Sequence, residues 1–286
     1  MAVYRRGYQR YAGERTSRWT RFLALPRFIW PRLFEQRLIL VLLVVSLFWP
    51  LACIAFIYVS NHSELWAGLD GGLAQFLQID ARFFRYFMDT QAVMAVLLAA
   101  LAGPGLIAPD LAHNGLPLYF SRPLSRLDYV LARLFTLAAL LALVTLVPAA
   151  LLFAMQGGLA GLDWLLRNWR LPAGVFIGFA LHILLVGLVA LACSAWVKWR
   201  MVAGALVVGF FFILAGAAEM LNQVLDVKWG TVLNPGAALY RLWSAMLGAE
   251  AGEGPGVWAC AAALLALGGL LSLVLEKKLR PVEVIS

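Results

Sequence analysis

The sequence predicts an all-α membrane protein with six transmembrane helices. Of its 286 residues, 63% are hydrophobic and 13% are charged, against about half and about a quarter in an average soluble domain. Six stretches lack Asp, Glu, Lys and Arg over close to the roughly 20 residues that a helix needs to cross the hydrocarbon core. No regular alternation of polar and apolar residues occurs, which argues against a transmembrane β-barrel.

Each uncharged stretch is long enough to form one helix, and a helix satisfies its backbone hydrogen bonds internally, as the bilayer requires. In chain order, the expected spans are Leu38–Val59, Gln91–Ala108, Leu134–Met155, Pro172–Val197, Met201–Ala218 and Val257–Val274. The chain then divides into a basic N-terminal segment (residues 1–37), a six-helix transmembrane domain (38–275) and a C-terminal tail (276–286).

The distribution of Lys and Arg predicts which side of the membrane each loop faces. Most of the 23 basic residues lie in the N-terminal segment, the loops after the second and fourth spans, and the C-terminal tail. Because basic loops stay in the cytoplasm, we expect both termini to be cytoplasmic. The net charge of +8 is thus a topology signal. No single patch combines basic residues with base-stacking aromatic residues, so we expect no nucleic-acid partner.

The N-terminal segment is expected to lie at the membrane surface. Between Ser17 and Phe34, arginines are mixed with Trp, Phe and Leu, a composition typical of a helix in the headgroup layer. Pro26 and Pro31 are expected to break or kink this helix. The segment lacks the apolar core and the small-residue cleavage site of a secretory signal peptide, so we expect the first span to be retained.

The sequence carries no pattern for catalysis or metal binding. The three cysteines fall within predicted spans, and the chain has no Cys-x-x-Cys pair, His-Glu-x-x-His motif or carboxylate cluster. His182 and Ser194 cannot form a catalytic dyad, because the intervening helix separates them by about 18 Å. No lysine follows a glycine, so a Walker A loop is missing. We therefore expect no enzyme activity, no metal and no cofactor bound by this chain; a partner must handle any ATP.

The loop between the second and third spans, residues 109–128, is the most informative segment. The stretch AGPGLIAPD weakens the second span near its inner end, and the following segment is too polar to span and too apolar for a solvated loop. We expect it to lie along the cytoplasmic surface. Asn114 and Gly115 suit a helix C-cap or tight turn. Ser125 and Asp128 match a capping-box variant at the start of the third span.

The run LIAPDLAHNGLPLYFSRPLSRLDYVLARLF, residues 106–135, resembles the cytoplasmic loop of ATP-binding cassette (ABC) transporter permeases of the type 2 exporter class. Such permeases share an acid, then Gly, then a Ser-Arg-Pro-x-Ser-Arg run that leads into the third helix. The resemblance implies a coupling helix that docks into a groove on a cytoplasmic ATP-binding subunit. The residues implied are Asp110, Asn114, Leu118, Tyr119 and Phe120 in or beside that helix, and Arg122, Pro123, Ser125 and Arg126 at its exit.

The same resemblance implies an assembly of two permease copies, identical or homologous, with two ATP-binding cassette ATPase subunits that bind ATP and Mg. Closure of the ATPases would push on the loop and export an unidentified substrate across the cytoplasmic (inner) membrane of a prokaryote. The first, second and fifth spans would line the path between the permeases. Arg122 and Arg126 also fit the positive-inside rule, and both roles can hold together.

Ionisable residues in or near the spans leave two alternatives open. Arg133, at the inner edge of the third span, is expected to reach toward the headgroups, and Glu219 to be hydrated or paired with Lys228 or Arg241. An ion-coupled secondary carrier would use an ionisable group near the midplane, for which His182 is the sole candidate. A non-transporting membrane scaffold would instead lack a partner ATPase.

A second amphipathic segment is expected before the last span. In residues 236–247, Leu239, Tyr240, Trp243 and Leu247 recur at helical spacing. We expect this helix to lie on the outer face of the membrane.

Overall fold

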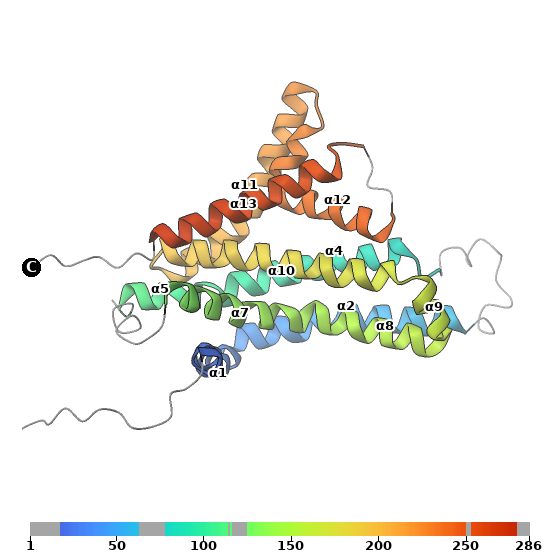
Figure 1. Ribbon diagram of the computed structural model, residues 1–286, viewed down its shortest axis with the longest axis horizontal. Helices are drawn as coiled ribbons and strands as arrows, with labels where there is room; N and C mark the ends of the chain where they lie inside the picture. Colours follow the sequence, from blue (N-terminus) through green and yellow to red (C-terminus); the bar gives the residue numbers. More distant parts are fainter. Residues whose placement is uncertain (1–17, 63–77, 114, 116–124, 250–252, 279–286) are drawn as a thin grey trace, which may run out of the picture.

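The computed structural model describes residues 18–62, 78–113, 115, 125–249 and 253–278 (Figure 1). Across these ranges the chain forms α-helices and one short 3-10 helix, without a β-strand. Six helical units are long and apolar enough to cross a membrane, which confirms the predicted all-α fold and the number of spans. Two units are longer than expected: α4 (Ala81–Ala102) continues into α5 (Pro104–Ala112), and α7 (Arg126–Val144) continues into α8 (Leu146–Ala160).

The remaining spans are single helices, and shorter elements lie between them. The spans are α2 (Arg37–Asn61), α10 (Arg170–Trp196), α11 (Arg200–Leu225) and α13 (Val257–Lys278); the shorter elements are α1 (Arg18–Phe34), α9 (Leu162–Arg167), η2 (Trp229–Leu233) and α12 (Pro235–Leu247). The start of α2 and the end of α13 lie at the same end of the bundle as α5 (Figure 1). We call this the α5 end, and the opposite end, where α9 lies, the α9 end.

Helix α10 is the centre of the bundle. Its apolar window is 67% buried, against 11% for α13, and it contacts α4, α5, α7, α8, α11, α12 and α13. Aromatic side chains fill the space around it: the ring of Phe179 packs edge-on against Phe87 of α4 at 5.9 Å, and Trp243 of α12 lies 6.3 Å from Phe179. The protein therefore has one continuous core built around a single helix.

The outer surface of the bundle is apolar. Large hydrophobic side chains are exposed along α2, α11 and α13, including Phe48, Phe212 and Leu265. Trp169, just before α10, and Trp196, the last residue of α10, are also exposed. Exposed Trp residues at the two ends of a span are typical of the aromatic belts at the membrane interfaces. Such a surface suits lipid contact, and the fold is that of a multi-pass membrane protein.

Helix α1 lies crosswise to the spans. Figure 1 shows it end-on while α2 and α7 run across the view, and it contacts both of these helices. This orientation suits the interfacial helix that the sequence predicts. The helix is continuous through Pro26 and Pro31, so a break at either proline is wrong. Each proline removes one backbone hydrogen bond, and burial of Pro26 and Leu33 helps to hold the helix together.

Helix α12 has the predicted helical spacing, and its apolar face packs against the other helices of the bundle. Leu239, Trp243 and Leu247 are all buried. The indole N–H of Trp243 donates a hydrogen bond to the carbonyl of Gly178 at 3.2 Å, and Gly178 lies about 12 Å along α10 from its first residue. The apolar face of α12 therefore packs on α10.

Candidate functional site

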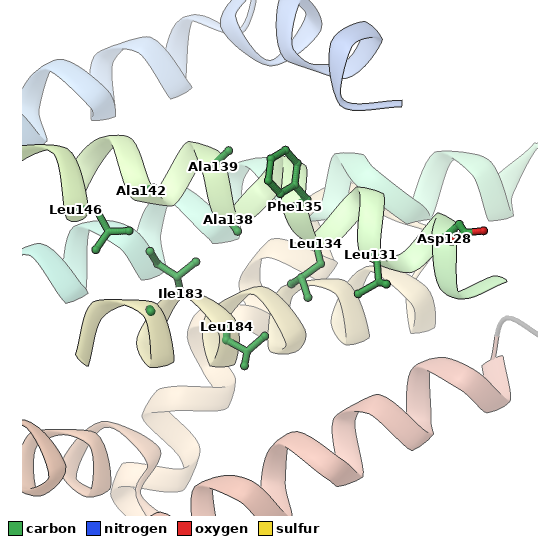
Figure 2. A pocket seen from close by; sticks show the side chains of 11 residues that line it. Asp128, Leu131, Leu134, Phe135, Ala138, Ala139, Ala142, Leu146, Ile183 and Leu184 are labelled. Atoms are coloured by element: carbon green, nitrogen blue, oxygen red, sulfur yellow. The ribbon is translucent and has the colours of Figure 1, made fainter. Parts of the chain in front are cut away.

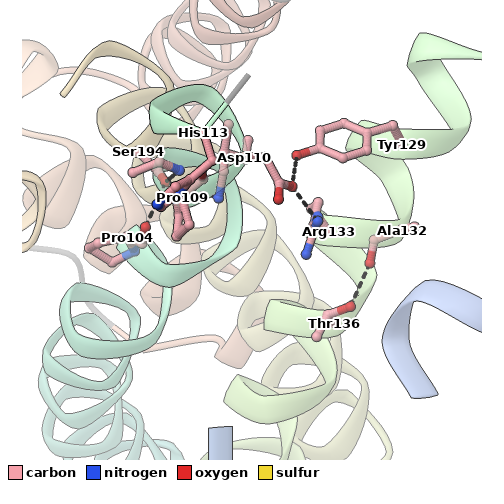
Figure 3. Close-up of polar contacts among 11 residues, drawn as sticks. Pro104, Pro109, Asp110, His113, Tyr129, Ala132, Arg133, Thr136 and Ser194 are labelled. Atoms are coloured by element: carbon pink, nitrogen blue, oxygen red, sulfur yellow. Dashed lines mark hydrogen bonds and ion pairs between the residues drawn. The ribbon is translucent and has the colours of Figure 1, made fainter. Parts of the chain in front are cut away.

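The junction between α4 and α5 is held against α10 by one buried serine (Figure 3). The Ser194 hydroxyl accepts hydrogen bonds from the backbone N–H groups of Ile107 at 3.2 Å and Ala108 at 3.0 Å. It also donates to the carbonyl of Pro104 at 3.1 Å. A helix that restarts after a break leaves N–H groups without intrahelical partners, and hydrocarbon supplies none. Ser194 therefore satisfies backbone groups in the first turns of α5.

Close packing at the same junction requires a glycine. A Cβ atom on Gly103 would lie 2.7 Å from the Cβ of Ala190 on α10 and 2.7 Å from the carbonyl oxygen of Ala99. Pro104 then begins α5 at its first position, where the missing N–H is tolerated. The Gly-Pro pair thus lets α5 follow α4 while the junction stays in close contact with α10.

We expect Ser194→Ala to lower the free energy of unfolding by about 1–3 kcal/mol, the range for leaving buried polar groups unsatisfied. Thermal unfolding in mild detergent measures the effect. The matched control is Ser272→Ala, because the Ser272 hydroxyl is exposed and donates only within its own helix, to Gly268. Equal melting temperatures for the two variants would contradict a role for Ser194 in holding the junction.

Asp110, in the last turn of α5, joins this helix to α7. One oxygen of its carboxylate accepts hydrogen bonds from the Tyr129 hydroxyl at 2.6 Å and from the Arg133 guanidinium at 2.5 Å. The two partners are four residues apart, so they lie on the same face of α7. The Arg133 guanidinium also lies 5.0 Å from the centre of the Tyr129 ring. Figure 3 shows all three side chains converging between the two helices.

The predicted path of Arg133 toward the headgroups is wrong. Arg133 is 5% exposed and forms an ion pair with Asp110. A charge removed from water is stabilised by an opposite charge and by hydrogen bonds, and Asp110 provides both. Arg133 does lie near the α5 end of its span, as expected for a residue at the membrane margin.

The predicted capping box at the start of α7 is confirmed. The backbone N–H of Asp128 donates to the Ser125 hydroxyl at 3.1 Å, and the backbone N–H of Ser125 donates to the Asp128 carboxylate at 3.2 Å. Arg126, the first residue of α7, is exposed. Asn114, Leu118, Tyr119, Phe120, Arg122 and Pro123, the other residues expected in the loop, lie outside the described residues. The structure thus fixes both flanks of the predicted loop: Asp110 on one side and Ser125 on the other.

Arg200, at the start of α11, connects three further elements at the α5 end. Its guanidinium hydrogen bonds to the side chain of Gln36, between α1 and α2, and to the carbonyl of Leu101 in α4 at 3.3 Å. It also lies beside Gly105, whose Cβ, if present, would be 3.8 Å from the guanidinium carbon. The starts of α2 and α11 and the α4–α5 junction are therefore tied together.

Glu219 does not form either of the pairs that the sequence suggested. It is exposed and accepts a hydrogen bond from Gln223 at 3.1 Å. Lys228 instead pairs with Glu253, and Arg241 donates to the carbonyl of Pro255 at 2.7 Å. Of the two expected partners, neither therefore pairs with Glu219, and its hydration stays a prediction.

Sequence reasoning placed Arg200 at the inner end of its span but missed the contacts that Gln36, Tyr129, Ser194 and Arg200 make there. Tyr129 stands four residues before Arg133, and that spacing is the one signal in the sequence that could have found it. Ser194 lies among small residues of an apolar helix and carries no comparable signal.

The described residues contain no cluster of His, Cys, Asp or Glu that could hold a metal ion. No protein-family model and no curated protein sequence gives a significant match to the chain.

Proposed function

We propose that this chain is the membrane permease subunit of an ABC exporter and that a partner ATPase docks on the segment between α5 and α7. The observation that carries the proposal is the attachment of both flanks of this segment. Asp110 links α5 to α7, while α5 itself continues the span formed by α4. A segment held by two spans moves only with them, so a force applied there displaces those spans as rigid bodies.

Charge supports the cytoplasmic orientation that this proposal needs. The described basic residues at or next to the α5 end are Arg27, Arg32, Arg37, Arg126, Arg133, Lys198, Arg200, Lys277 and Lys278. By the positive-inside rule, the α5 end faces the cytoplasm. The protein would then reside in the cytoplasmic membrane of a prokaryote, with the docking segment on the side where ATP is available.

The proposed assembly contains two permeases, identical or homologous, and two ATPase subunits that bind ATP and Mg. The apolar windows of α2 and α11 are only 22% and 17% buried, so these spans have apolar surface available for the second permease. The chain itself contributes no catalytic residue. Its role is to convert ATPase closure into movement of α4, α5 and α7.

The first test is affinity purification of the chain from its native membrane in mild detergent, with mass spectrometry of the proteins that accompany it. We expect an ATPase with Walker motifs, and we expect Arg122→Glu together with Arg126→Glu to reduce its recovery about ten-fold or more, since reversed charges repel a complementary surface. The matched control is Arg167→Glu with Arg170→Glu, which reverses two exposed charges at the α9 end.

Two results would contradict the proposal. One is recovery of the wild-type chain without any ATPase. The other is an equal loss of ATPase in both double variants, because that would show a general effect of charge rather than docking at the α5 end. Membrane levels of each variant are measured alongside, so that failed insertion is recognised.

An ion-coupled secondary carrier is the second candidate, and one observation favours it. His182 is buried in α10, where its Nε2 atom lies 3.2 Å from the carbonyl oxygen of Ala92. Its Nδ1 atom has no hydrogen-bond partner among the described residues. Purification without an ATPase, combined with proton-driven substrate uptake that His182→Gln abolishes, would favour the carrier. If neither a partner ATPase nor proton-driven uptake is found, the non-transporting membrane scaffold is favoured.

A further inference from the structure

A long apolar groove runs between α7 and α13, with α10 as its floor. Its volume is about 1390 Å³, which exceeds the roughly 300–1,000 Å³ of a typical small-molecule site. Leucines from four helices line it, among them Leu134, Leu188 and Leu264, and Leu239 and Leu242 of α12 line its deep end. A neighbouring hollow of about 880 Å³ shares part of this wall and continues along α7 (Figure 2).

The charged side chains of the groove lie at one end. Among the described residues that line it, only Arg126 and Glu276 are charged. Arg126 is the first residue of α7, and Glu276 lies in the last turn of α13, so both are at the α5 end. Both are exposed, and the described part of the chain offers neither of them an ion pair. The groove thus has an apolar interior and a mouth that carries one positive and one negative group.

We propose that this groove binds a phospholipid with an ammonium headgroup, phosphatidylethanolamine, from the leaflet at the α5 end. The Arg126 guanidinium would bind the phosphate, for which its planar set of donors is well suited. The Glu276 carboxylate would bind the ammonium group. The acyl chains would lie along the leucines toward α12. This proposal requires only that the bundle spans a membrane, and it does not depend on the proposed ATPase partner.

The dimensions of the groove suit a lipid of one leaflet. From Glu276 to Ala261, its α13 wall is about 22 Å long at 1.5 Å per residue. One leaflet contributes about 15 Å to the hydrocarbon core, so the tails of a lipid at the mouth fit within this length. A tilted or kinked acyl chain also fits.

Selectivity must come from the mouth, because acyl chains are in apolar surroundings both in the groove and in the bilayer. This separates two kinds of variant. A change at Glu276 is expected to alter which lipid is retained, whereas loss of Arg126 weakens binding of the phosphate that both lipids carry. Filling the apolar interior is expected to alter whether any lipid is retained.

The test uses the full chain reconstituted in vesicles of equal phosphatidylethanolamine and phosphatidylglycerol, extracted in mild detergent and analysed by native mass spectrometry. We expect wild type to retain phosphatidylethanolamine in preference to phosphatidylglycerol. Glu276→Lys should reverse this preference, since two positive groups then face an anionic headgroup. Arg126→Gln should lower retention of both lipids about ten-fold, the effect of losing a charge-assisted hydrogen bond.

Gly269→Phe tests the interior. Gly269 lines the groove, and a Cβ atom there meets nothing within 4 Å, so the ring can enter the groove without displacing the backbone. We expect it to remove the retained lipid. Gly158→Phe is the matched control, because Gly158 on α8 is equally open but lies outside the groove.

The proposal is wrong if wild type shows no preference between the two lipids, or if Gly269→Phe retains as much phosphatidylethanolamine as Gly158→Phe. It is also wrong if Leu265→Cys forms disulfide-linked dimers in the membrane, because a second copy would then cover the groove. Should Gly269→Phe fail to fold, the reversal by Glu276→Lys still decides the outcome, since Glu276 is exposed and its replacement leaves the core intact.

Discussion

Asp110→Ala is expected to lower the free energy of unfolding by about 2–4 kcal/mol, somewhat less than the roughly 3–5 kcal/mol for breaking a fully buried ion pair from one side, because 20% of the Asp110 side chain is exposed. The variant leaves Arg133, which is 5% exposed, as a buried charge without its carboxylate. It also removes the acceptor of the Tyr129 hydroxyl. Thermal unfolding in mild detergent, followed by tryptophan fluorescence, measures the change.

The double variant Asp110→Ala, Arg133→Met tests whether the loss of stability comes from the buried charge of Arg133 or from the lost contact between α5 and α7. Replacing both members of a buried ion pair by apolar groups is often close to neutral, so we expect the double variant to recover most of the lost stability. Asp163→Ala is the control, because Asp163 is exposed on α9 and surface substitutions usually stay within about 0.5 kcal/mol. A double variant as unstable as Asp110→Ala would contradict this account.

The number of spans could be predicted because a membrane helix leaves a long signal in composition. Their boundaries could not. Helix α4 begins at Ala81, ten residues before the uncharged stretch, and its first turns contain Arg82, Arg85 and Asp89. The guanidinium of Arg85 lies 5.0 Å from the centre of the Tyr240 ring on α12. Charged residues with partners inside the bundle can therefore belong to a span. The uncharged stretch that predicts the span begins only after them.

The pairing of Asp110 with Arg133 illustrates what local patterns omit. The capping box of Ser125 and Asp128 spans three residues, so the sequence could predict it. Asp110 and Arg133 belong to different helices, and their contact depends on how α5 packs against α7. The positive-inside rule concerns which side of the membrane a residue faces, and it does not specify whether its side chain turns inward.

The packing of α12 likewise depends on a contact between two different helices. Spacing of Leu239, Trp243 and Leu247 predicts one apolar face, and lipid or another helix satisfies that face equally well on composition alone. The deciding contact is the close approach at Gly178, where a Cβ atom would lie 2.8 Å from the Trp243 ring. That fit is a property of two packed helices.

Gly204→Ala and Gly216→Ala, both on α11, are expected to change stability in opposite directions. Alanine in place of glycine normally stabilises a helix by about 0.5–1 kcal/mol. At Gly216 a Cβ atom meets nothing within 4 Å, so this gain should appear in full. At Gly204 the new Cβ would lie 2.5 Å from the carbonyl oxygen of Ala100 on α4, and overpacking of this kind costs about 1–3 kcal/mol.

The effect at Gly204 should be large because it falls where α11 packs closely on α4. Among the described residues of α11, only Ala203, Val207 and Ala218 are buried, and two of these lie beside Gly204. Figure 1 shows α11 leaving the bundle beyond its first turns. We therefore expect Gly204→Ala to lower the melting temperature and to weaken the contact that Arg200 makes with Leu101. A rise in melting temperature for both variants would mean that α11 does not approach α4 at Ala100, and the arrangement of the α5 end would then need a different account.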